Sequence, residues 1–461
     1  MVKLSPIALS RFSTGPAHMP RDSYTGVEYN LGFSVEHYDL NMDYRVEPNR
    51  LHGQATLEVT ADSDPDKMSA NLTLDMADFL DADRVSVSGA PRVTRFRQSG
   101  GKLRIRLQNA PRPGAHFTLR IAYSGNPRPI RTRWGELGWE ETATGAIVAS
   151  QPNGAPSWFP CDDTPAAKAT FRIAVVADNP FTVVATGQPV EKQAAGPGNT
   201  RWVFETTHPM ATYLAAIQVG EYVQIPLGPT TQAFVPAHLR DSVSEDFAHQ
   251  QEMVDFFSSL FGEYPFPMYS VVVTADELEI PVEAQGLSTF GANHARGHHT
   301  FERLVAHELC HQWFGNSVGL TGWRDIWLNE GFACYCEWLW AEHFSQGAKT
   351  AHSVARSHYD VLARKPQDIT VADPGPEDMF DDRVYKRGAL TLHAVRRALG
   401  DAPFFRAVRS YLADNQHSNV TQDDLVGYFH RAAGEAGIGT QAIDDLLHAW
   451  IDEPALPAFP R

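Results

Sequence analysis

Residues 304 to 320 read "LVAHELCHQWFGNSVGL", in which two histidines flank a glutamate and a cysteine. Side chains four residues apart lie on one face of an α-helix, a turn above one another. His307 and His311 can therefore direct two imidazoles at one metal ion, while Glu308 lies about 100° further round the helix. This offset suits a base acting on a metal-bound water better than a third ligand. Cys310 falls on another side of the helix, where we expect it to contribute packing.

A third metal ligand is expected from the stretch "WLNEGFACYCEW", which follows after a short interval. Glu330 is separated from His311 by 18 residues. Two histidines and one carboxylate, with a fourth position left to water, form the ligand set of a catalytic zinc ion. Glu337 lies seven residues further on, near the same helix face. It can orient a ligating histidine through the other ring nitrogen, or it can be an exposed glutamate. Thr300 is the predicted N-cap of the histidine helix.

The bulk composition is that of an ordinary globular protein of two or three domains, with 461 residues, 43% hydrophobic and 20% charged. The formal net charge of −16 argues against a nucleic acid partner, since phosphate binding needs a basic surface. Residues 1 to 22 contain no apolar core of signal-peptide length, and no stretch is long enough to span a membrane. We therefore expect neither a nucleic acid nor a membrane partner.

Cysteine usage predicts a cytoplasmic protein. Four cysteines in so long a chain do not suggest a disulfide framework: Cys161, Cys310, Cys334 and Cys336. A metal site made of the last two is not expected, because positions two apart diverge on a helix.

The pattern of apolar residues divides the chain into a β half and a mostly helical half. Segments such as "KLRIRLQ" (102–108) and "HFTLRIAYSG" (116–125) alternate apolar and polar residues. We predict an N-terminal extension over 1–24, an antiparallel β domain over 25–223 with a saddle or sandwich shape, and a mainly α domain with a small mixed sheet over 224–461. Helices are predicted over 243–262, 300–315, 327–345, 346–364, 382–399, 402–415, 422–434 and 441–451.

The sequence resembles the aminopeptidase N family of zinc metallopeptidases, gluzincins related to leukotriene hydrolases. The resemblance is carried by "HELCHQWFGN" (307–316) and "WLNEGFA" (327–333), and it extends through "GFSVEHYDLNMDYRV" (32–46), "QPNGAPSWFPCDDTPAAKATF" (151–171), "MATYLAAIQVGEY" (210–222) and "VYKRGAL" (384–390). It implies a thermolysin-like catalytic domain that binds one Zn²⁺. The chain's end at "HAWIDEPALPAFPR" (448–461) resembles the end of that domain, so we expect a short form without the family's C-terminal helical domain, and a more open active site.

The resemblance also implies a binding site for the substrate's amino group. The family's Gly-Ala-Met-Glu-Asn segment corresponds to "EIPVEAQGLSTFG" (279–291), where only the glutamate is retained, as Glu283. A carboxylate that holds an ammonium at a fixed distance from the metal would select the N-terminal residue of a peptide. The alternative is a carboxylate on an exposed strand edge. By the same resemblance Gln151 lines the site, and Asn153 stands where many relatives carry a second acid.

The segment around Tyr385 resembles the one that carries the family's catalytic tyrosine. The resemblance implies that Tyr385 donates a hydrogen bond to the oxyanion formed when water attacks a peptide carbonyl. Lys386 and Arg387 are expected to be solvated. The histidines of "NHARGHHT" (293–300), His294, His298 and His299, are not expected to bind the catalytic metal, because three ligands are already present.

These residues predict a zinc aminopeptidase that hydrolyses the N-terminal residue of peptides. The predicted mechanism has a zinc-bound water attack with Glu308 as general base and Tyr385 stabilising the oxyanion. Three alternatives remain open: a thermolysin-type endopeptidase without an amine anchor, an epoxide hydrolase, and a non-catalytic scaffold. A scaffold would be expected to have lost ligands, base or tyrosine, and all five positions are intact. The sequence does not indicate the oligomeric state.

Overall fold

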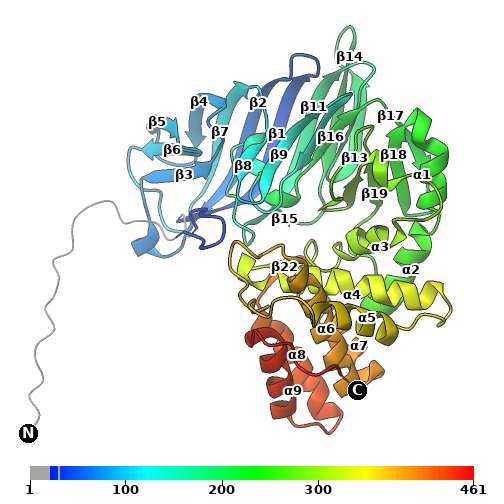
Figure 1. The fold of residues 1–461 in the computed structure, drawn as a ribbon. Helices are drawn as coiled ribbons and strands as arrows, with labels where there is room; N and C mark the ends of the chain where they lie inside the picture. The colour runs from blue at the N-terminus through cyan, green and yellow to red at the C-terminus, as the bar shows by residue number, and fades with distance from the viewer. Residues whose placement is uncertain (1–20, 30–31, 461) are drawn as a thin grey trace, which may run out of the picture.

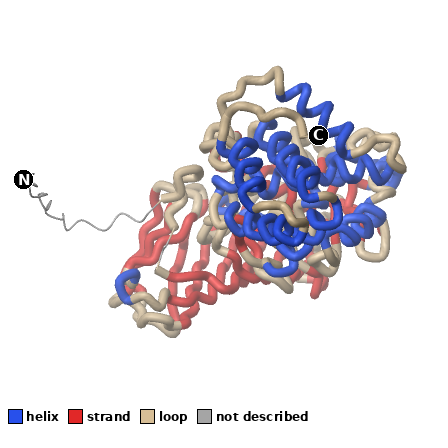
Figure 2. Tube along the Cα trace, turned by 90° about the horizontal axis from the view of Figure 1, so that it is seen from below, coloured by secondary structure: helices blue, strands red, loops and turns tan. Residues whose placement is uncertain are grey.

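The computed structural model describes residues 21–29 and 32–460, so most of the predicted N-terminal extension lies outside the described residues. Strands fill the first half of the chain, and helices gather in the second (Figures 1 and 2). The largest sheet has the strand order β13-β14-β11-β1-β2-β7-β4. Its strands are β1 (Phe33–Arg45), β2 (Arg50–Ala61), β4 (Leu80–Ser88), β7 (His116–Gly125), β11 (Lys168–Asp178), β13 (Gln188–Ala194) and β14 (Asn199–Glu205), with β15 (Met210–Ala211) pairing β11.

In these strands, buried residues alternate with more exposed ones, as the alternation of apolar and polar residues in the sequence predicts. In β1, Tyr38, Leu40, Met42 and Tyr44 are buried while the residues between them are partly exposed. One pairing differs from the prediction of an antiparallel domain, because β1 and β11 run parallel. Several strands of other sheets separate β1 from β11 in the chain, which gives the room that a parallel connection needs.

Two smaller sheets complete the β half. A three-stranded sheet contains β3 (Asn71–Asp75), β6 (Lys102–Leu107) and β5 (Val93–Ser99). A five-stranded sheet contains β12 (Thr182–Ala185), β16 (Ile217–Gly220), β10 (Gly145–Ala149), β9 (Gly135–Thr142) and β8 (Ile130–Thr132).

The second half begins with the small mixed sheet that was predicted. Its order is β17 (Tyr222–Pro226), β18 (Thr231–Pro236), β19 (Tyr269–Val273), β21 (Leu287–Phe290) and β20 (Val282–Ala284). The pairs β18–β19 and β19–β21 are parallel, and the outer pairs are antiparallel. The domain boundary predicted between residues 223 and 224 falls within β17 and stays a prediction.

Helices follow in nearly the predicted series. They are α1 (Arg240–Asp246), α2 (Gln250–Phe261), α3 (Glu302–Cys310), α4 (Trp327–Phe344), α5 (Ala351–Leu362), α6 (Asp382–Leu399), α7 (Asp401–Asp414), α8 (Gln422–Glu435) and α9 (Thr440–Leu447). The helix predicted over 243–262 is divided into α1 and α2, and a two-residue β22 (Gly319–Leu320) pairs β23 (Asn419–Val420). Within the described part of the chain, no helix is long and apolar enough to cross a lipid bilayer.

Helix α4 is the centre of the helical half, because its residues 327–340 are buried on every side. It packs against α3 and, most closely, against α6. A Cβ added to Gly331 would lie only 3.0 Å from the backbone of Gly388, so two glycines allow α4 and α6 to approach each other. This close packing brings Tyr385 of α6 to the face of α4 that carries Glu330.

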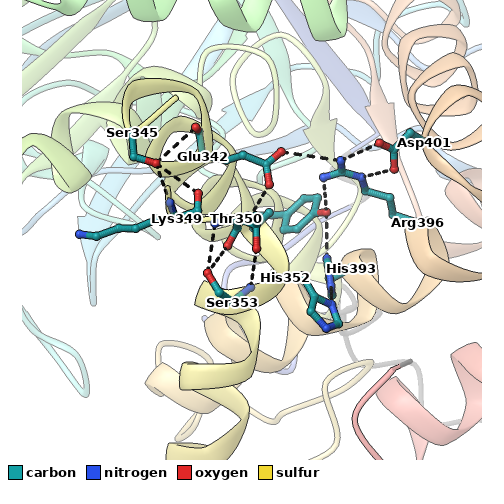
Figure 3. Close-up of polar contacts among 11 residues, drawn as sticks. Glu342, Ser345, Lys349, Thr350, His352, Ser353, His393, Arg396 and Asp401 are labelled. Atoms are coloured by element: carbon teal, nitrogen blue, oxygen red, sulfur yellow. Dashed lines mark hydrogen bonds and ion pairs between the residues drawn. The ribbon is translucent and has the colours of Figure 1, made fainter. Parts of the chain in front are cut away.

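Polar contacts join the far end of α4 to α5, α6 and α7 (Figure 3). Arg396 lies between two carboxylates, at 2.9 Å from Asp401 Oδ1 and 4.0 Å from Glu342 Oε1. The Glu342 carboxylate also accepts a hydrogen bond of 2.6 Å from the backbone N–H of Ala351, at the start of α5. His352 and His393 lie 3.1 Å apart through their ring nitrogens. These contacts fix the helices that support α4.

Two local predictions about the histidine helix are wrong. Helix α3 begins at Glu302 with Phe301 as N-cap, so Thr300 is not the cap. Cys310 does more than pack, because it forms a disulfide with Cys336 across the contact between α3 and α4, with Cα atoms 6.4 Å apart. Periodicity within one helix carries no information on which residue of a second helix will lie opposite.

The prediction that Lys386 and Arg387 are solvated is also wrong. Arg387 is buried, and its guanidinium donates to backbone carbonyls of the C-terminal segment, among them those of Trp450 at 2.6 Å and Pro454 at 2.6 Å. Lys386 Nζ lies 3.3 Å from Cys334 Sγ. A guanidinium carries enough donors to satisfy several carbonyls at once, which is how Arg387 is stabilised in a buried position.

A half-buried lysine joins the two halves of the molecule. Lys168 in β11 donates through Nζ to the backbone carbonyls of Asn316 at 3.0 Å, Ser317 at 2.8 Å and Ser418 at 2.9 Å. Asn316 and Ser317 lie in the turns after the histidine helix, which ends at Cys310, so this contact fixes the β half beside the candidate site.

Candidate metal centre

Helix α3 and the first turns of α4 place three possible metal ligands together. His307 lies in the last turn of α3, and His311 is its C-cap, with its backbone N–H bonded to the carbonyl of His307. Glu330 lies in the first turn of α4. Its Oε2 is 3.4 Å from His307 Nε2 and 3.4 Å from His311 Nε2. The three ligand atoms lie within 4.8 Å of one another, and all three residues are buried.

The other nitrogen of each imidazole is held by a fixed acceptor. His307 Nδ1 lies 2.8 Å from Glu337 Oε1, and His311 Nδ1 lies 3.1 Å from the carbonyl oxygen of Phe314. Arg303 donates to the second oxygen of Glu337 at 3.1 Å. An acceptor at Nδ1 keeps the proton there and leaves Nε2 free as an electron-pair donor. Both rings are thus oriented with Nε2 toward Glu330.

The electrostatics of the cluster favour positive charge at the two imidazoles. Burial alone would lower the pKa of His307, but the contacts with Glu330 and Glu337 outweigh it and raise that pKa to about 9. Burial would also lower the pKa of His311, but the negative charges of Glu330 and Glu283 outweigh it and raise that pKa to about 10. Burial disfavours the Glu330 carboxylate, yet the two histidines lower its pKa to about 2. A site that draws positive charge onto two imidazoles also favours a divalent cation.

Glu308 lies beside this cluster with part of its carboxylate unpaired. It is buried, its ligand atom lies within 4.8 Å of those of His311 and Glu283, and its Oε2 has no hydrogen-bond partner among the described residues. Burial raises its pKa above the ordinary value. A buried carboxylate oxygen without a protein partner is suited to bind a water or a substrate proton.

Glu283 and Gln151 are brought together although they come from different halves of the chain. Gln151 Nε2 donates to Glu283 Oε1 at 2.5 Å. Burial, with the charges of Glu330 and Glu308, raises the pKa of Glu283 to about 7. Glu283 is 7% exposed, so it does not lie on a solvated strand edge. The Oδ1 of Asn153 is buried without a hydrogen-bond partner among the described residues.

Two residues that the sequence did not single out position Glu283. Gln312, next to His311, donates to the carbonyl of Ala284 at 3.1 Å and accepts from the backbone N–H of Gly286 at 2.7 Å. Asn316 donates to the same carbonyl of Ala284 at 3.0 Å. These bonds attach the β20–β21 hairpin to the end of the histidine helix. Both residues lie within "HELCHQWFGN", but nothing in their spacing indicates a partner strand.

Tyr385 lies over the metal-ligand cluster. Its ring is stacked on that of His307, with centroids 6.2 Å apart and planes inclined by 12°. Burial and the neighbouring carboxylates of Glu330, Glu283 and Glu308 raise its pKa well above the ordinary value. The phenol therefore keeps its proton at neutral pH and can act as a donor. Tyr213, which the sequence analysis did not single out, has its pKa raised by burial and by Glu283 and Glu330.

The residues present fit one zinc ion. Two imidazole nitrogens and one carboxylate oxygen form the donor set of catalytic zinc, and the second nitrogens are held as such sites require. The unpaired oxygen of Glu308 leaves a place for water next to them. The histidines 294, 298 and 299 do not belong to this cluster.

Two family models match most of the chain. The peptidase M1 N-terminal domain covers residues 34–214, and the peptidase family M1 domain covers residues 245–450. The chain is 28% identical to aminopeptidase M1-A of Oryza sativa over 68% of its length, and 25% identical to leucine aminopeptidase 2 of Saccharomyces cerevisiae over its whole length. It spans only 37% of the rice protein and 69% of the yeast protein.

A solved relative has the same fold over almost the whole chain. It is an M1 zinc metallopeptidase of Deinococcus radiodurans, a variant of which has been crystallised with a Tyr-Ser-Ala substrate. The two chains are 29% identical, the similarity covers 95% of this chain and 99% of the other, and the TM-score is 0.83.

Proposed function

The chain belongs to peptidase family M1, and on that premise we propose that it is a zinc aminopeptidase, which removes the first residue of peptides with a free N-terminus. The observation that carries the proposal is the pairing of two sites. The cluster of His307, His311 and Glu330 fits a catalytic metal, and the hydrogen-bonded pair of Glu283 and Gln151 lies directly beside it.

Zinc is the metal named for the solved relative. When bound by His307, His311 and Glu330, it would lower the pKa of the attacking water and polarise the peptide carbonyl. Glu308 acts as general base: its free carboxylate oxygen takes a proton from the attacking water and passes it to the leaving amine. Tyr385 donates its phenolic hydrogen to the oxyanion, since its raised pKa keeps the proton in place. Glu337 acts only through His307, which it orients.

Selection of the first residue follows from the amine anchor. An ammonium group held by the Glu283 carboxylate fixes the distance from the N-terminus to the metal centre, so only the first peptide bond is presented. Gln151 holds one oxygen of that carboxylate, and Gln312 holds its strand. The peptide bound to the Deinococcus radiodurans relative supports peptides as the substrate class.

A comparison of free and blocked substrates tests the proposal. Aminoacyl 4-nitroanilides with a free amino group should be hydrolysed, while N-acetylated ones should be hydrolysed only at a low residual rate. A chelator should abolish the activity, and added Zn²⁺ should restore it. Equal hydrolysis of free and acetylated substrates would instead indicate an endopeptidase, and activity indifferent to the chelator would reject the metal centre.

Glu283→Gln is the sharper variant for the anchor, because it keeps the side-chain shape and removes the charge. We expect KM for free-amine substrates to rise strongly, while the residual hydrolysis of acetylated substrates stays the same. An equal fall for both substrate types would reject the anchor.

The proposed cytoplasmic location rests on the low cysteine count alone. The Cys310–Cys336 disulfide argues against it, because such bonds are rare in reducing compartments, and cell fractionation decides the point.

A further inference from the structure

A second group of metal-binding side chains lies at the other end of helix α3. His249, His299 and Glu302 each offer a ligand atom, and these atoms lie within 4.8 Å of one another. Glu302 and His307 are five residues apart on one helix, which corresponds to about 7.5 Å along its axis. The group is therefore distinct from the catalytic cluster and shares no residue with it.

The three side chains come from three segments of the chain. His249 is the N-cap of α2, Glu302 is the first residue of α3, and His299 belongs to the loop before α3. His249 Nδ1 lies 2.6 Å from Glu302 Oε1, and the rings of His249 and His299 are stacked with centroids 4.8 Å apart. One ring nitrogen lacks a partner: His299 Nδ1 is buried and bonds to none of the described residues. A buried polar atom without a protein partner requires an explanation, and a bound ion is one that fits this group.

The loop that carries His299 is held in an unfavourable conformation. Gly297, His298 and His299 have φ angles of 81°, 73° and 56°, which residues other than glycine rarely adopt. The conformation is maintained by two carboxylates of α1. Asp246 accepts from the backbone N–H groups of Gly297 and His299, both at 2.7 Å, and Glu245 accepts from that of His298 at 3.1 Å. The loop thus presents the His299 ring to His249 and Glu302 in a fixed position.

Aromatic rings lie on another side of the group. The ring of His249 is 4.8 Å from that of Phe344 and 6.5 Å from that of Trp340, measured between centroids. An apolar wall limits access of water and strengthens metal–ligand interactions.

We propose that His249, His299 and Glu302 bind a second divalent metal ion, which joins the start of α2, the start of α3 and the loop that precedes α3. Two imidazoles and one carboxylate suit Zn²⁺ or a neighbouring transition metal better than Ca²⁺ or Mg²⁺, which prefer oxygen ligands. Because α3 carries the catalytic histidines, an ion at this place would hold the catalytic helix at its start. Because the group shares no residue with the catalytic cluster, we assign the ion a structural role.

His298 provides a matched control for the test. It adjoins His299, shares the left-handed conformation, and has an 88% exposed side chain that does not belong to the group. Asparagine, like histidine, is among the non-glycine residues that adopt this conformation most readily, so His299→Asn and His298→Asn place equal demands on the loop. Glu302→Gln provides a second variant in case His299→Asn does not fold.

Zinc content is measured by mass spectrometry on the full-length protein after equilibration with buffered free Zn²⁺, and thermal unfolding is recorded over the same zinc series. Two zinc equivalents are expected for the unchanged protein and for His298→Asn, and one for His299→Asn and Glu302→Gln. At the higher zinc concentrations, Tm should rise only for the unchanged protein and for His298→Asn, because an ion that binds the folded state stabilises it. One equivalent in the unchanged protein, or equal zinc content in His299→Asn and His298→Asn, would overturn the proposal. The difference in zinc content between His299→Asn and His298→Asn does not depend on the catalytic site, because neither substitution changes that site.

Discussion

Removal of the Glu337 carboxylate should weaken zinc binding although Glu337 is not a ligand. Glu337 is 4% exposed and lies 2.8 Å from His307 Nδ1, with Arg303 on its other oxygen. Partners of this kind contribute about 10- to 100-fold to metal affinity, which is about 1.4 to 2.7 kcal/mol. A hydrogen bond to a charged group contributes about 1.5–3 kcal/mol and a neutral one about 1 kcal/mol, which agrees with that range.

Two substitutions separate the charge of Glu337 from its hydrogen bond. In Glu337→Gln the amide oxygen can still accept from His307, so we expect zinc affinity to fall about tenfold. Glu337→Ala removes both contributions, and a fall of about 100-fold is expected. Affinity is measured by competition with a chromophoric chelator. Glu342→Gln is the control, because Glu342 lies on the same helix but contacts Ala351 and Arg396. Unchanged affinity in Glu337→Ala would refute the orienting role.

Three further predictions concern the reaction and the β half. Glu308→Gln should lower kcat about 10²- to 10⁴-fold while zinc content is unchanged; near-normal turnover would exclude Glu308 as the base. Tyr385→Phe should lower kcat about 10²- to 10³-fold with little change in KM, and an effect confined to KM would contradict an oxyanion contact. Burial raises the pKa of Asp162 to about 7, from about 3.9 in an unfolded chain. The folded state therefore binds the extra proton, and stability should fall by up to about 4 kcal/mol as pH rises from 4 to 7. Asp162→Asn should flatten this slope in urea unfolding at several pH values; an unchanged slope would show that the carboxyl is not protonated in the fold.

The metal cluster could be predicted from the sequence because its geometry is local. Four-residue spacing within one helix places His307 beside His311, and the buried helix that follows presents Glu330 in its first turn. The boundaries of α4 and α6 were also predictable to within a residue, since each has a strong apolar pattern or a terminal glycine.

Contacts between distant segments could not be read from spacing. Gln151 and Glu283 are 132 residues apart, and only the packing of the β half on the helical half joins them. The burial of Arg387 depends on where the C-terminal segment passes, and the Cys310–Cys336 bond depends on how α4 faces α3. Periodicity describes which side of an element is buried, but it does not describe the surface that covers it.

Anomalous diffraction at the zinc absorption edge, from crystals of the active protein, tests the metal centre most directly. A peak is expected at about 2.0–2.2 Å from His307 Nε2, His311 Nε2 and a carboxylate oxygen of Glu330. Active crystals with no anomalous density at that position would contradict the account.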